Sequence, residues 1–543
     1  MKTSTYILTI FIFLAIFPLY AQELTDTETT TEETPAESIP EQDISFDDNT
    51  VYIIADFIFD VKGRVRHDAL IYNGEFQKGE RIQGKANLEK YIRDKTQLLT
   101  NQRVLKDNVQ ISYSLGEQNP DGAYPVILTI KVEETWNIIA LPKPNYDQNT
   151  GFKITINVRD YNFLGTMNPL RIDFGYEYDQ NGRSSFLLEI DSDTPFNAFG
   201  YNWNINFDNS FGYRVVDDPD PPFYYQNLSG ISMELPFRNT TFTFGFEESF
   251  NVNEENPDRY KKRYGGTEDD FQTGLYMSSK LYTTWKIPIG LEVSEYGELT
   301  YTPQITATFN HELPQWELHE FRHGPFLGFS HSFGFGKIDW LSNFRSGYSA
   351  WLSNGYSYDF HRLRNNVEPL SVSLSLTGTG HFIISDFFSI SSRLRYRHWF
   401  YHDPEWYEQA GDTIRGILDK SMCADYMISL NMDFPFRVLE FTPSRWFEKW
   451  KTTFFDFELQ LSPIIDMAFY NDPNPNPKTN ISFNHKNFAV GGGLEVIVFP
   501  AFMRNFYVRL SLACNIRELI TARPFGIPGG KNREITFGTG LFY

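Results

Sequence analysis

The chain has 543 residues, of which 17% are aromatic, and its formal net charge at pH 7 is −21. Such an acidic chain offers no electrostatic footprint for nucleic acid, and two cysteines in this length exclude a disulfide scaffold. Beyond the N-terminus no run of about 18 apolar residues occurs, which excludes a helical membrane protein. Abundant aromatic residues with a hydrophobic fraction of only 41% are typical of a transmembrane β-barrel, whose residues alternate between lipid and a polar lumen.

Residues 1–21 have the pattern of a secretory signal peptide. Lys2 precedes a largely apolar run from Tyr6 to Tyr20, and Ala21 supplies the small residue of a cleavage point. The run is short for a membrane helix and a polar stretch follows it; an uncleaved helical anchor is the alternative. Residues 22–50 carry ten acids and no bases. They contain too little apolar surface to offset their ordering entropy, which predicts a disordered linker.

Residues 51–134 have the pattern of a compact α/β unit. A strand over Tyr52–Phe59 precedes helical periodicity from Asn87 to Leu99, and we expect a second short helix from Gln102 to Asp107. Two further strands complete the unit as a hairpin, over Val109–Ser114 and Val126–Val132. A unit of this kind leaves a free sheet edge, which can add a strand from an extended peptide.

From residue 135 to residue 543 the chain has the pattern of successive strands. Alternating segments such as Thr241–Phe246 are bounded by Asn, Asp, Gly or Pro turns. Short turns alternate roughly with long loops, which is the habit of outer-membrane barrels. We therefore predict an all-β, antiparallel transmembrane barrel of sixteen to eighteen strands. An even number is expected, and sixteen is the preferred number.

The last residues have the pattern of a closing barrel strand. Side chains alternate from Ile535 to an aromatic C-terminus at Tyr543. Gly538 and Gly540 interrupt this strand, and glycine weakens both packing and pairing. We assign Gly538, Gly540 and Tyr543 to a gate in the closing strand; the alternative is that the glycines serve simple barrel curvature.

Three short segments follow one another along the barrel region. Arg159–Thr166 reads RDYNFLGT, Ile414–Ile417 reads IRGI, and Ile465–Ala468 reads IDMA. With the preceding signal and the small α/β unit, they resemble the early-barrel turn, the sixth-loop tip and the D-x-G strand motif of the BamA/TamA superfamily of outer-membrane assembly proteins. The small unit would then be a POTRA-like domain. This sequence departs from the family pattern at three positions, Met167, Ile417 and Ala468.

The resemblance implies that the loop carrying Arg415 folds back into the barrel. A buried guanidinium needs carboxylate partners, and alternation turns Asp433 and Asp466 of the following strands toward the lumen. Arginine suits two carboxylates because its five donors form a rigid fork, and Gly416 permits a tight backbone approach. The predicted loop-to-lumen clamp is Arg415, Gly416, Asp433 and Asp466. The alternative is an exposed loop arginine and two solvated acids.

Motifs for enzyme chemistry are nearly absent. The chain has no G-x-S-x-G segment and no P-loop, and we expect no catalytic residue, metal or cofactor. His319–His323 reads HEFRH and matches the H-E-x-x-H zinc motif. That motif needs a helix, and Pro314 before it and a Gly-Pro pair after it leave little room for one. His398 and His402 lie on a strand and favour an interface girdle over a metal pair.

The resemblance implies a protein of the cell outer membrane with its N-terminal domain in the periplasm. It would insert or translocate unfolded outer-membrane β-barrel clients through an opening between the first and last strands. Accessory lipoproteins, periplasmic chaperones and outer-membrane lipid are further candidate partners. A single POTRA-like unit is fewer than a typical BamA protein has, which favours an accessory or divergent role. The alternatives are a two-partner-secretion-type transporter for one dedicated substrate, a plain porin or structural barrel, and an outer-membrane enzyme.

Overall fold

The structure is a computed structural model, and it describes most of the chain after residue 49. The described residues are 50–147, 151–178, 184–214, 223–252, 275–293, 297–311, 324–364, 366, 368–401, 408–409, 413–417, 423–446, 453–471, 488–521, 533–539 and 541. The predicted signal peptide, and the predicted linker up to residue 49, lie outside them. Residues from Asp48 onward belong to one compact unit.

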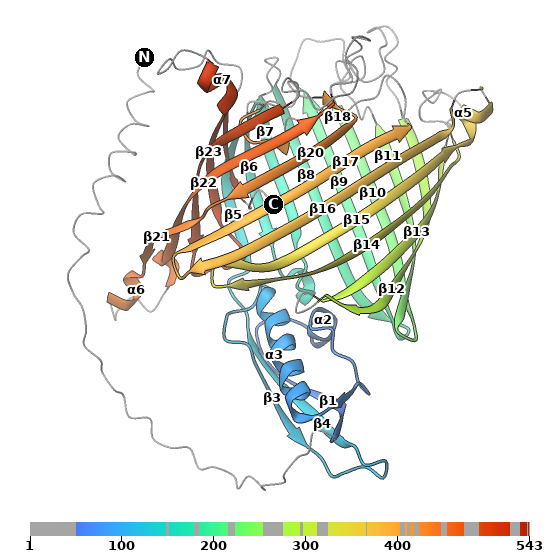
Figure 1. Ribbon diagram of the computed structural model, residues 1–543, viewed down its shortest axis with the longest axis vertical. Coiled ribbons are helices and arrows are strands. Elements are labelled where there is room, and N and C mark those ends of the chain that lie inside the picture. The colour runs from blue at the N-terminus through green and yellow to red at the C-terminus, as the bar shows by residue number, and fades with distance from the viewer. Residues whose placement is uncertain are drawn as a thin grey trace. The chain divides into compact units, whose positions relative to one another are not determined.

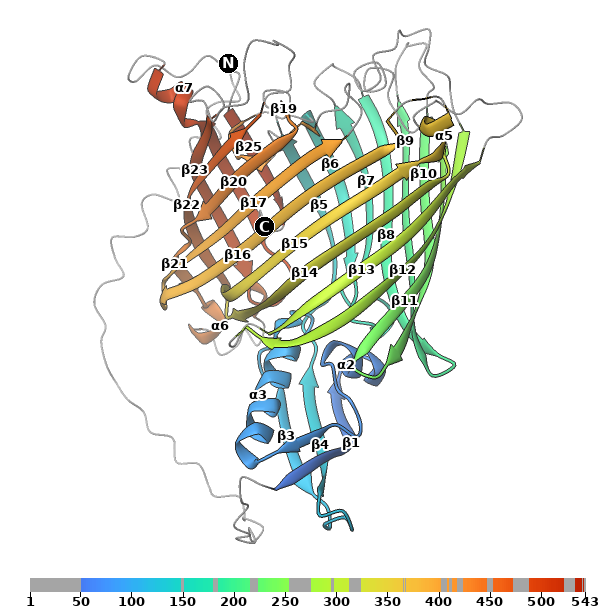
Figure 2. The same ribbon diagram turned by 45° about the vertical axis from the view of Figure 1, so that its right-hand side comes forward.

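Residues 51–134, which we call the N-terminal domain, contain a four-stranded sheet of order β2–β1–β4–β3, and Figure 2 labels its strands β1, β3 and β4. Strand β1 is parallel to β4 and antiparallel to β2, and β3 is antiparallel to β4. Leu70, Leu88 and Leu99 from the helices are fully buried with Leu128 and Ile130 of the sheet, and together they form the core. The bounds are β1 Val51–Lys62, α2 His67–Asn73, β2 Arg81–Gln83, α3 Lys85–Asn101, β3 Gln110–Leu115 and β4 Tyr124–Glu133.

The helices of this domain differ in part from the prediction. Helix α3 contains the predicted helix and extends it at both ends. The helix predicted over Gln102–Asp107 is wrong, because this segment is a turn in which Leu105 forms a backbone bridge with Glu134. The second helix, α2, comes before α3 instead. Its seven residues are too few to show a helical period in the sequence.

A second, much larger antiparallel sheet follows, and it contains nineteen strand segments among the residues described. Their bounds are β5 Ile138–Asp147, β6 Gly151–Asp160, β7 Leu170–Tyr178, β8 Ser184–Ala198, β9 Tyr201–Arg214, β10 Phe223–Phe237, β11 Thr240–Val252, β12 Leu275–Glu292, β13 Glu298–His311, β14 Phe326–Leu341, β15 Phe344–Asp359, β16 Leu370–Ser385, β17 Phe388–Tyr401, β20 Tyr426–Asp433, β21 Phe436–Phe441, β22 Phe457–Tyr470, β23 Phe488–Pro500, β24 Val508–Asn515 and β25 Arg533–Thr539.

Short elements lie between these strands. The helices are η2 Phe163–Gly165, α5 Phe360–Arg364, α6 Pro443–Trp446, η8 Thr453–Phe455 and α7 Ile516–Thr521. A separate two-stranded sheet consists of β18 Glu408–Gln409 and β19 Cys423–Ala424.

The preferred number of sixteen strands is too low. β20 and β21 both lie between β17 and β22, so they are two halves of one strand that is interrupted at Phe434 and Pro435. Counted in this way the described sheet has eighteen strands, which is the upper end of the predicted range. Strand β5 is hard to recognise in the sequence because Pro142 and Pro144 lie within it, and proline is rare inside strands.

The large sheet (Figure 1) has the strand order of a closed barrel, in which the last strand, β25, lies next to the first, β5. We call the boundary between β25 and β5 the seam. At one end of the barrel, β8–β9, β10–β11, β14–β15 and β16–β17 are each joined by two-residue turns; we call this end the short-turn rim. The opposite end, which includes the connection from β17 to β20, is the long-loop rim.

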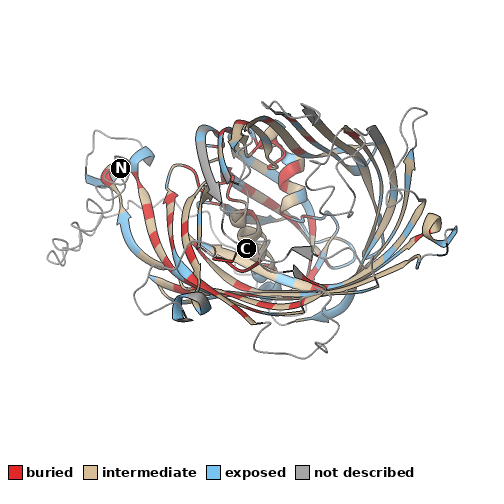
Figure 3. Ribbon diagram, turned by 90° about the horizontal axis from the view of Figure 1, so that it is seen from above, coloured by how far each residue is buried: buried red, intermediate tan, exposed pale blue. Residues whose placement is uncertain are grey.

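A row of exposed apolar side chains crosses the outer face of the sheet. Ile231 of β10 pairs with Phe246 of β11, which in turn pairs with Leu281 of β12, and all three are at least 40% exposed. Along the strands, more buried positions alternate with exposed ones (Figure 3), as the pleat requires. Within the described part of the chain, no helix has the length and apolar character needed to span a membrane.

Candidate functional site

The loop between β17 and β20 places Arg415 in the interior of the barrel. Ile414, Arg415 and Ile417 are buried, although the sequence puts them in a loop. The Arg415 guanidinium binds Asp466 of β22 through two nitrogens: Nε lies 2.8 Å from Oδ2 and Nη2 lies 2.7 Å from Oδ1. The backbone N–H of Arg415 also donates to Oδ2 at 2.9 Å. This is the bidentate geometry for which an arginine fork is suited.

Two further carboxylates surround the same guanidinium. Asp433 Oδ1 of β20 lies 2.6 Å from Nη2, and Glu495 Oε1 of β23 lies 3.1 Å from Nη1. Arg509 of β24 approaches Glu495 at 3.5 Å. A buried ion pair offsets the loss of hydration only when its donors and acceptors are well satisfied. Asp466 and Glu495 accept hydrogen bonds from Arg415, and Asp433 adds a third counter-charge.

Strand alternation explains why these acids face the interior. In β20 every second residue from Met427 to Asp433 is buried, and in β22 the same alternation includes Asp466. The cross-strand partners of Asp466 are Asn431 and Gly491. The structure therefore brings together Arg415, Asp433 and Asp466, the three charged residues that the sequence predicted as a clamp.

Glu495 was missed in the sequence. It lies in β23, where Gly493, Leu494 and Val496 surround it and no residue but Glu495 carries charge. A lone acid in such a strand is the signal that could have identified it, because an unpaired charge in a barrel wall is costly. Which arginine it would meet depends on the strand order, and that order is not readable from β23 alone.

Gly416 fits the loop tip against the last strands. Its φ is +89°, and a Cβ built there would lie 2.5 Å from the backbone nitrogen of Cys514 in β24. Its N–H donates to Glu534 Oε2 of β25 at 2.7 Å. Gly491 of β23 makes similar room, because its Cβ would lie 1.9 Å from the carbonyl oxygen of Arg415. The loop tip thus contacts β20, β22, β23, β24 and β25, and the contact of Gly416 with Glu534 of β25 was not predicted.

Two departures from the family pattern fall in one apolar cluster. Ile417 and Ala468 are both buried in it. Its other members are Ile414, Ala424, Met427 and Ala489. The aliphatic Ile417 is therefore a packed residue, and the loop tip is held by apolar contact as well as by charge.

The predicted gate residues are only partly described. Gly538 lies in β25 and pairs with Arg509 of β24. Gly540 and Tyr543 lie outside the described residues, and the role of all three stays a prediction.

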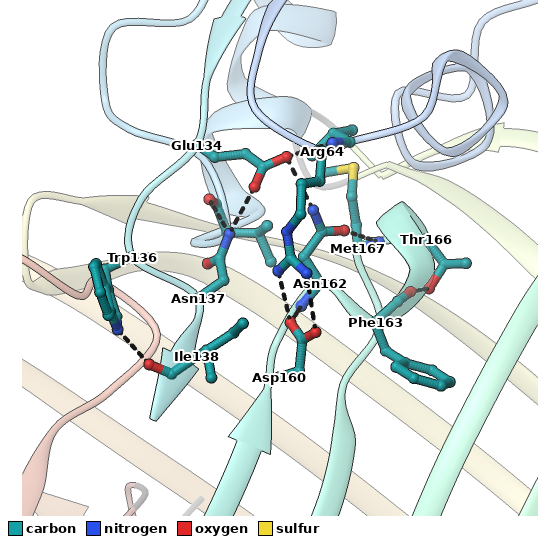
Figure 4. A network of polar contacts seen from close by, with 12 residues as sticks. Arg64, Glu134, Trp136, Asn137, Ile138, Asp160, Asn162, Phe163, Thr166 and Met167 are labelled. Atoms are coloured by element: carbon teal, nitrogen blue, oxygen red, sulfur yellow. Dashed lines mark hydrogen bonds and ion pairs between the residues drawn. The ribbon is translucent and has the colours of Figure 1, made fainter. Parts of the chain in front are cut away.

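The early-barrel motif forms the turn between β6 and β7, where the barrel meets the N-terminal domain (Figure 4). Asp160 accepts from both terminal nitrogens of Arg64, at 3.0 and 3.3 Å. Asn162 Nδ2 donates to Glu134 Oε1 at 3.0 Å, and its Oδ1 accepts from the Met167 N–H at 2.9 Å. The motif residues thus connect residues 51–134 to the barrel.

The histidine motifs do not gather into a site in the described residues. His319–His323 and His402 lie outside them. His398 stacks on Phe400 with ring centroids 3.8 Å apart and hydrogen-bonds Tyr396 at 2.9 Å. Across the described segments, no group of three or more His, Cys, Asp or Glu side chains is placed to hold a metal ion.

Comparison with known proteins gives low similarities. No protein-family model matches the chain, and no curated protein matches its sequence. Among solved structures, CdiB from Acinetobacter baumannii is 12% identical, with a TM-score of 0.44 over 90% of this chain and 74% of that one. BamA from Haemophilus ducreyi lacking POTRA domains 1–3 is 11% identical, with a TM-score of 0.37 over 90% and 84%. CdiB from Escherichia coli is 9% identical, with a TM-score of 0.39 over 92% of each chain. Similarities of this size assign neither a family nor a function.

Proposed function

We propose that this protein is an outer-membrane barrel of the BamA/TamA type that inserts or translocates polypeptides. The observation that carries the proposal is the buried loop tip, in which Arg415 binds Asp433, Asp466 and Glu495. A passive pore has no need to bury a charged loop residue among three acids, because each buried charge is costly. A loop that regulates the wall of the barrel does need a defined docked position.

The contacts of the loop tip support a role at the seam. Glu534 of β25 accepts the Gly416 N–H, so the docked loop is tied to the strand that borders β5. If the seam separates, the free edge of β5 or β25 exposes unpaired N–H and C=O groups. A client strand could then pair with that edge. This mechanism involves no covalent chemistry, and we propose no enzymatic step.

The outer surface and the N-terminal domain support the proposed location. The exposed row through Ile231, Phe246 and Leu281 suits a lipid environment. The N-terminal domain joins the barrel at the short-turn rim, and in outer-membrane barrels short turns face the periplasm. Its order is strand, helix, short strand, helix and two further strands, and apart from the short β2 this is the order we expect for a POTRA-like unit. The domain would receive unfolded clients there, and a single unit favours an accessory or divergent assembly role.

Depletion in the native host tests this proposal. We expect depletion of the protein to lower the levels of several unrelated outer-membrane barrels, as measured by quantitative proteomics of the outer membrane. Wild-type protein should restore them, whereas Arg415→Ala should not. Arg171→Ala is the matched control, since Arg171 also pairs with an acid, Asp191, but is half exposed.

The other outcomes identify the alternatives. Loss of one secreted protein with unchanged barrel levels would indicate a dedicated transporter. Unchanged protein levels with altered solute permeability would indicate a porin and would overturn the proposal.

A further inference from the structure

Two turns flank the seam at the short-turn rim. On the side of β25, residues 501–507 join β23 to β24. On the side of β5, residues 161–169 join β6 to β7. Only β25 and β5 lie between β24 and β6 in the strand order. A domain that contacts both turns therefore spans the seam.

The N-terminal domain holds the first turn by an exchange of arginines. Arg504 of the turn donates to the carbonyl oxygen of Leu105 at 2.7 Å and pairs with Asp107. In the opposite direction, Arg103 of the domain donates through Nε to the carbonyl oxygen of Arg504. Both arginine residues are at most 9% exposed. Each arginine binds a backbone carbonyl oxygen of the opposite segment. Together they fix the position and the orientation of the turn relative to the domain.

Arg103 also contacts the turn between β14 and β15. Its Nη1 donates to Ser342 O at 3.3 Å and its Nη2 to Asn343 Oδ1 at 3.0 Å, both in the β14–β15 turn. Its guanidinium also lies 4.2 Å from the ring centroid of Trp340, a cation–π distance. Burial, with Arg504 nearby, lowers the pKa of Arg103 to about 10, so the side chain remains charged at neutral pH.

The same domain holds the second turn by separate contacts. Arg64 forms the bidentate pair with Asp160, and Glu134 accepts from Asn162 (Figure 4). The Arg66 N–H donates to the Gly165 carbonyl oxygen at 3.0 Å. A Cβ at Gly165 would lie 2.4 Å from the Arg64 carbonyl oxygen, so the two backbones are in close contact. None of these residues takes part in the contacts to the first turn.

We propose that the N-terminal domain is a brace across the seam at the short-turn rim, with Arg103 and Arg504 as positioning residues on one flank and Arg64 and Asp160 on the other. β24 and β6 cannot separate at this rim unless one set of contacts breaks. Opening of the seam with the domain in place is therefore confined to the long-loop rim. The proposal rests on the proposed function only in taking the seam as the path of the client.

Distances between spin labels across the seam test the brace. One pair, at Ala501 and Leu164, spans the seam at the short-turn rim, and both positions are exposed. A second pair, at Leu519 and Tyr178, spans it at the long-loop rim, and both are also exposed. Each pair is introduced as cysteines into the full chain with Cys423→Ala and Cys514→Ala, and distances are measured by pulsed electron paramagnetic resonance in lipid vesicles.

We expect Arg103→Gln with Arg504→Gln to shift the short-turn pair to longer and broader distances and to leave the long-loop pair unchanged. Arg81→Gln is the control, because Arg81 pairs with Asp121 inside the domain and is exposed; it should change neither pair. Unchanged short-turn distances in the double variant would overturn the brace. Should that variant not fold, as judged by its mobility on gels with and without heating, Asp107→Asn with Arg103→Lys gives a milder test with the same expected direction. The readout is a distance, so failure of client insertion leaves it interpretable.

Discussion

At the scale of single residues, Arg415 is a buried charge held in the barrel interior by several acids. Its guanidinium and backbone together contact three acids on three strands. Because each of these groups is buried, removal of the arginine leaves carboxylates without their counter-charge. The cost of that change comes mainly from leaving buried carboxylates without a counter-charge, and less from the loss of the contact itself.

We predict that Arg415→Ala lowers the free energy of unfolding by about 3–5 kcal/mol. Urea titration of the protein folded in lipid vesicles measures this change. The free energy of unfolding of Arg415→Lys should lie between those of the wild type and Arg415→Ala, since lysine keeps the charge but loses the bidentate fork. In a double-mutant cycle with Asp466→Ala, the single and double variants should have nearly equal effects. Purely additive losses would show that the two residues act independently.

Glu534 offers a second test at the residue scale. Its carboxylate accepts the Gly416 N–H at 2.7 Å, and hydrogen bonds to charged groups contribute about 1.5–3 kcal/mol. We predict that Glu534→Ala destabilises the barrel within that range and speeds proteolytic cleavage of the loop between β17 and β20. Thr536→Ala is the control, because the Thr536 hydroxyl donates to Glu534 and to no described residue of the loop. Equal cleavage rates in the two variants would count against a tie between loop and last strand.

At the scale of elements, the loop tip and strand β23 are fitted to each other by the absence of side chains. Gly491 leaves space for the Arg415 carbonyl oxygen, and Gly416 leaves space for the backbone of β24. The glycines therefore provide the space in which the loop docks, and the ion pairs stabilise the docked position. Neither feature is sufficient without the other, because the ion pairs form only at close approach.

We predict that Gly491→Ala undocks the loop, because the new Cβ would lie 1.9 Å from a backbone oxygen that has no freedom to rotate away. Overpacking of this kind costs about 1–3 kcal/mol. Limited proteolysis of the folded protein should show faster cleavage of the loop. The matched control is Gly378→Ala in β16, where the nearest atom to a Cβ is 3.9 Å away. A loop equally protected in both variants would mean that β23 adapts instead.

At the scale of the whole molecule, the barrel has an apolar outside and a polar inside. The row through Ile231, Phe246 and Leu281 faces outward, whereas Glu247, beside Phe246, pairs with Lys280 at 3.0 Å. This distribution is the inverse of a soluble protein's. It is stable only if lipid covers the outer face, because exposed apolar area is unfavourable in water.

We predict that Phe246→Arg, in the middle of β11, destabilises the barrel by about 2–4 kcal/mol in lipid vesicles, and that Phe237→Arg, at the end of β10, costs about 0–1 kcal/mol. Both phenylalanines are exposed, so they differ chiefly in depth. Urea unfolding monitored by gel mobility without heating measures both. Equal costs at the two positions would contradict a membrane centred on the middle of the strands.

The parts of the site that were predictable share one property. Asp433 and Asp466 could be turned inward from sequence because a strand alternates its faces with a period of two, whatever its partners are. Glu495, Glu534 and the turns bound by Arg103 could not be found in that way. Their partners lie 80, 118 and up to 401 positions away along the chain, and the pairing depends on strand order and register. Helix α2 and strand β5 were difficult to predict for a local reason. Helix α2 is too short to show a helical period, and β5 contains prolines, which are atypical of strands.

The sequence by itself determined the architecture of this protein: a small α/β unit, then antiparallel strands with apolar and polar faces, and an arginine loop that needs acids. These follow from local alternation, composition and the cost of a buried charge. Only the tertiary structure decided the number of strands, the third carboxylate at Arg415, the tie from Gly416 to β25 and the two-sided contact of the N-terminal domain with the turns beside the seam. Each of these is a contact between distant segments, and the closure of the sheet into a ring fixes which segments meet.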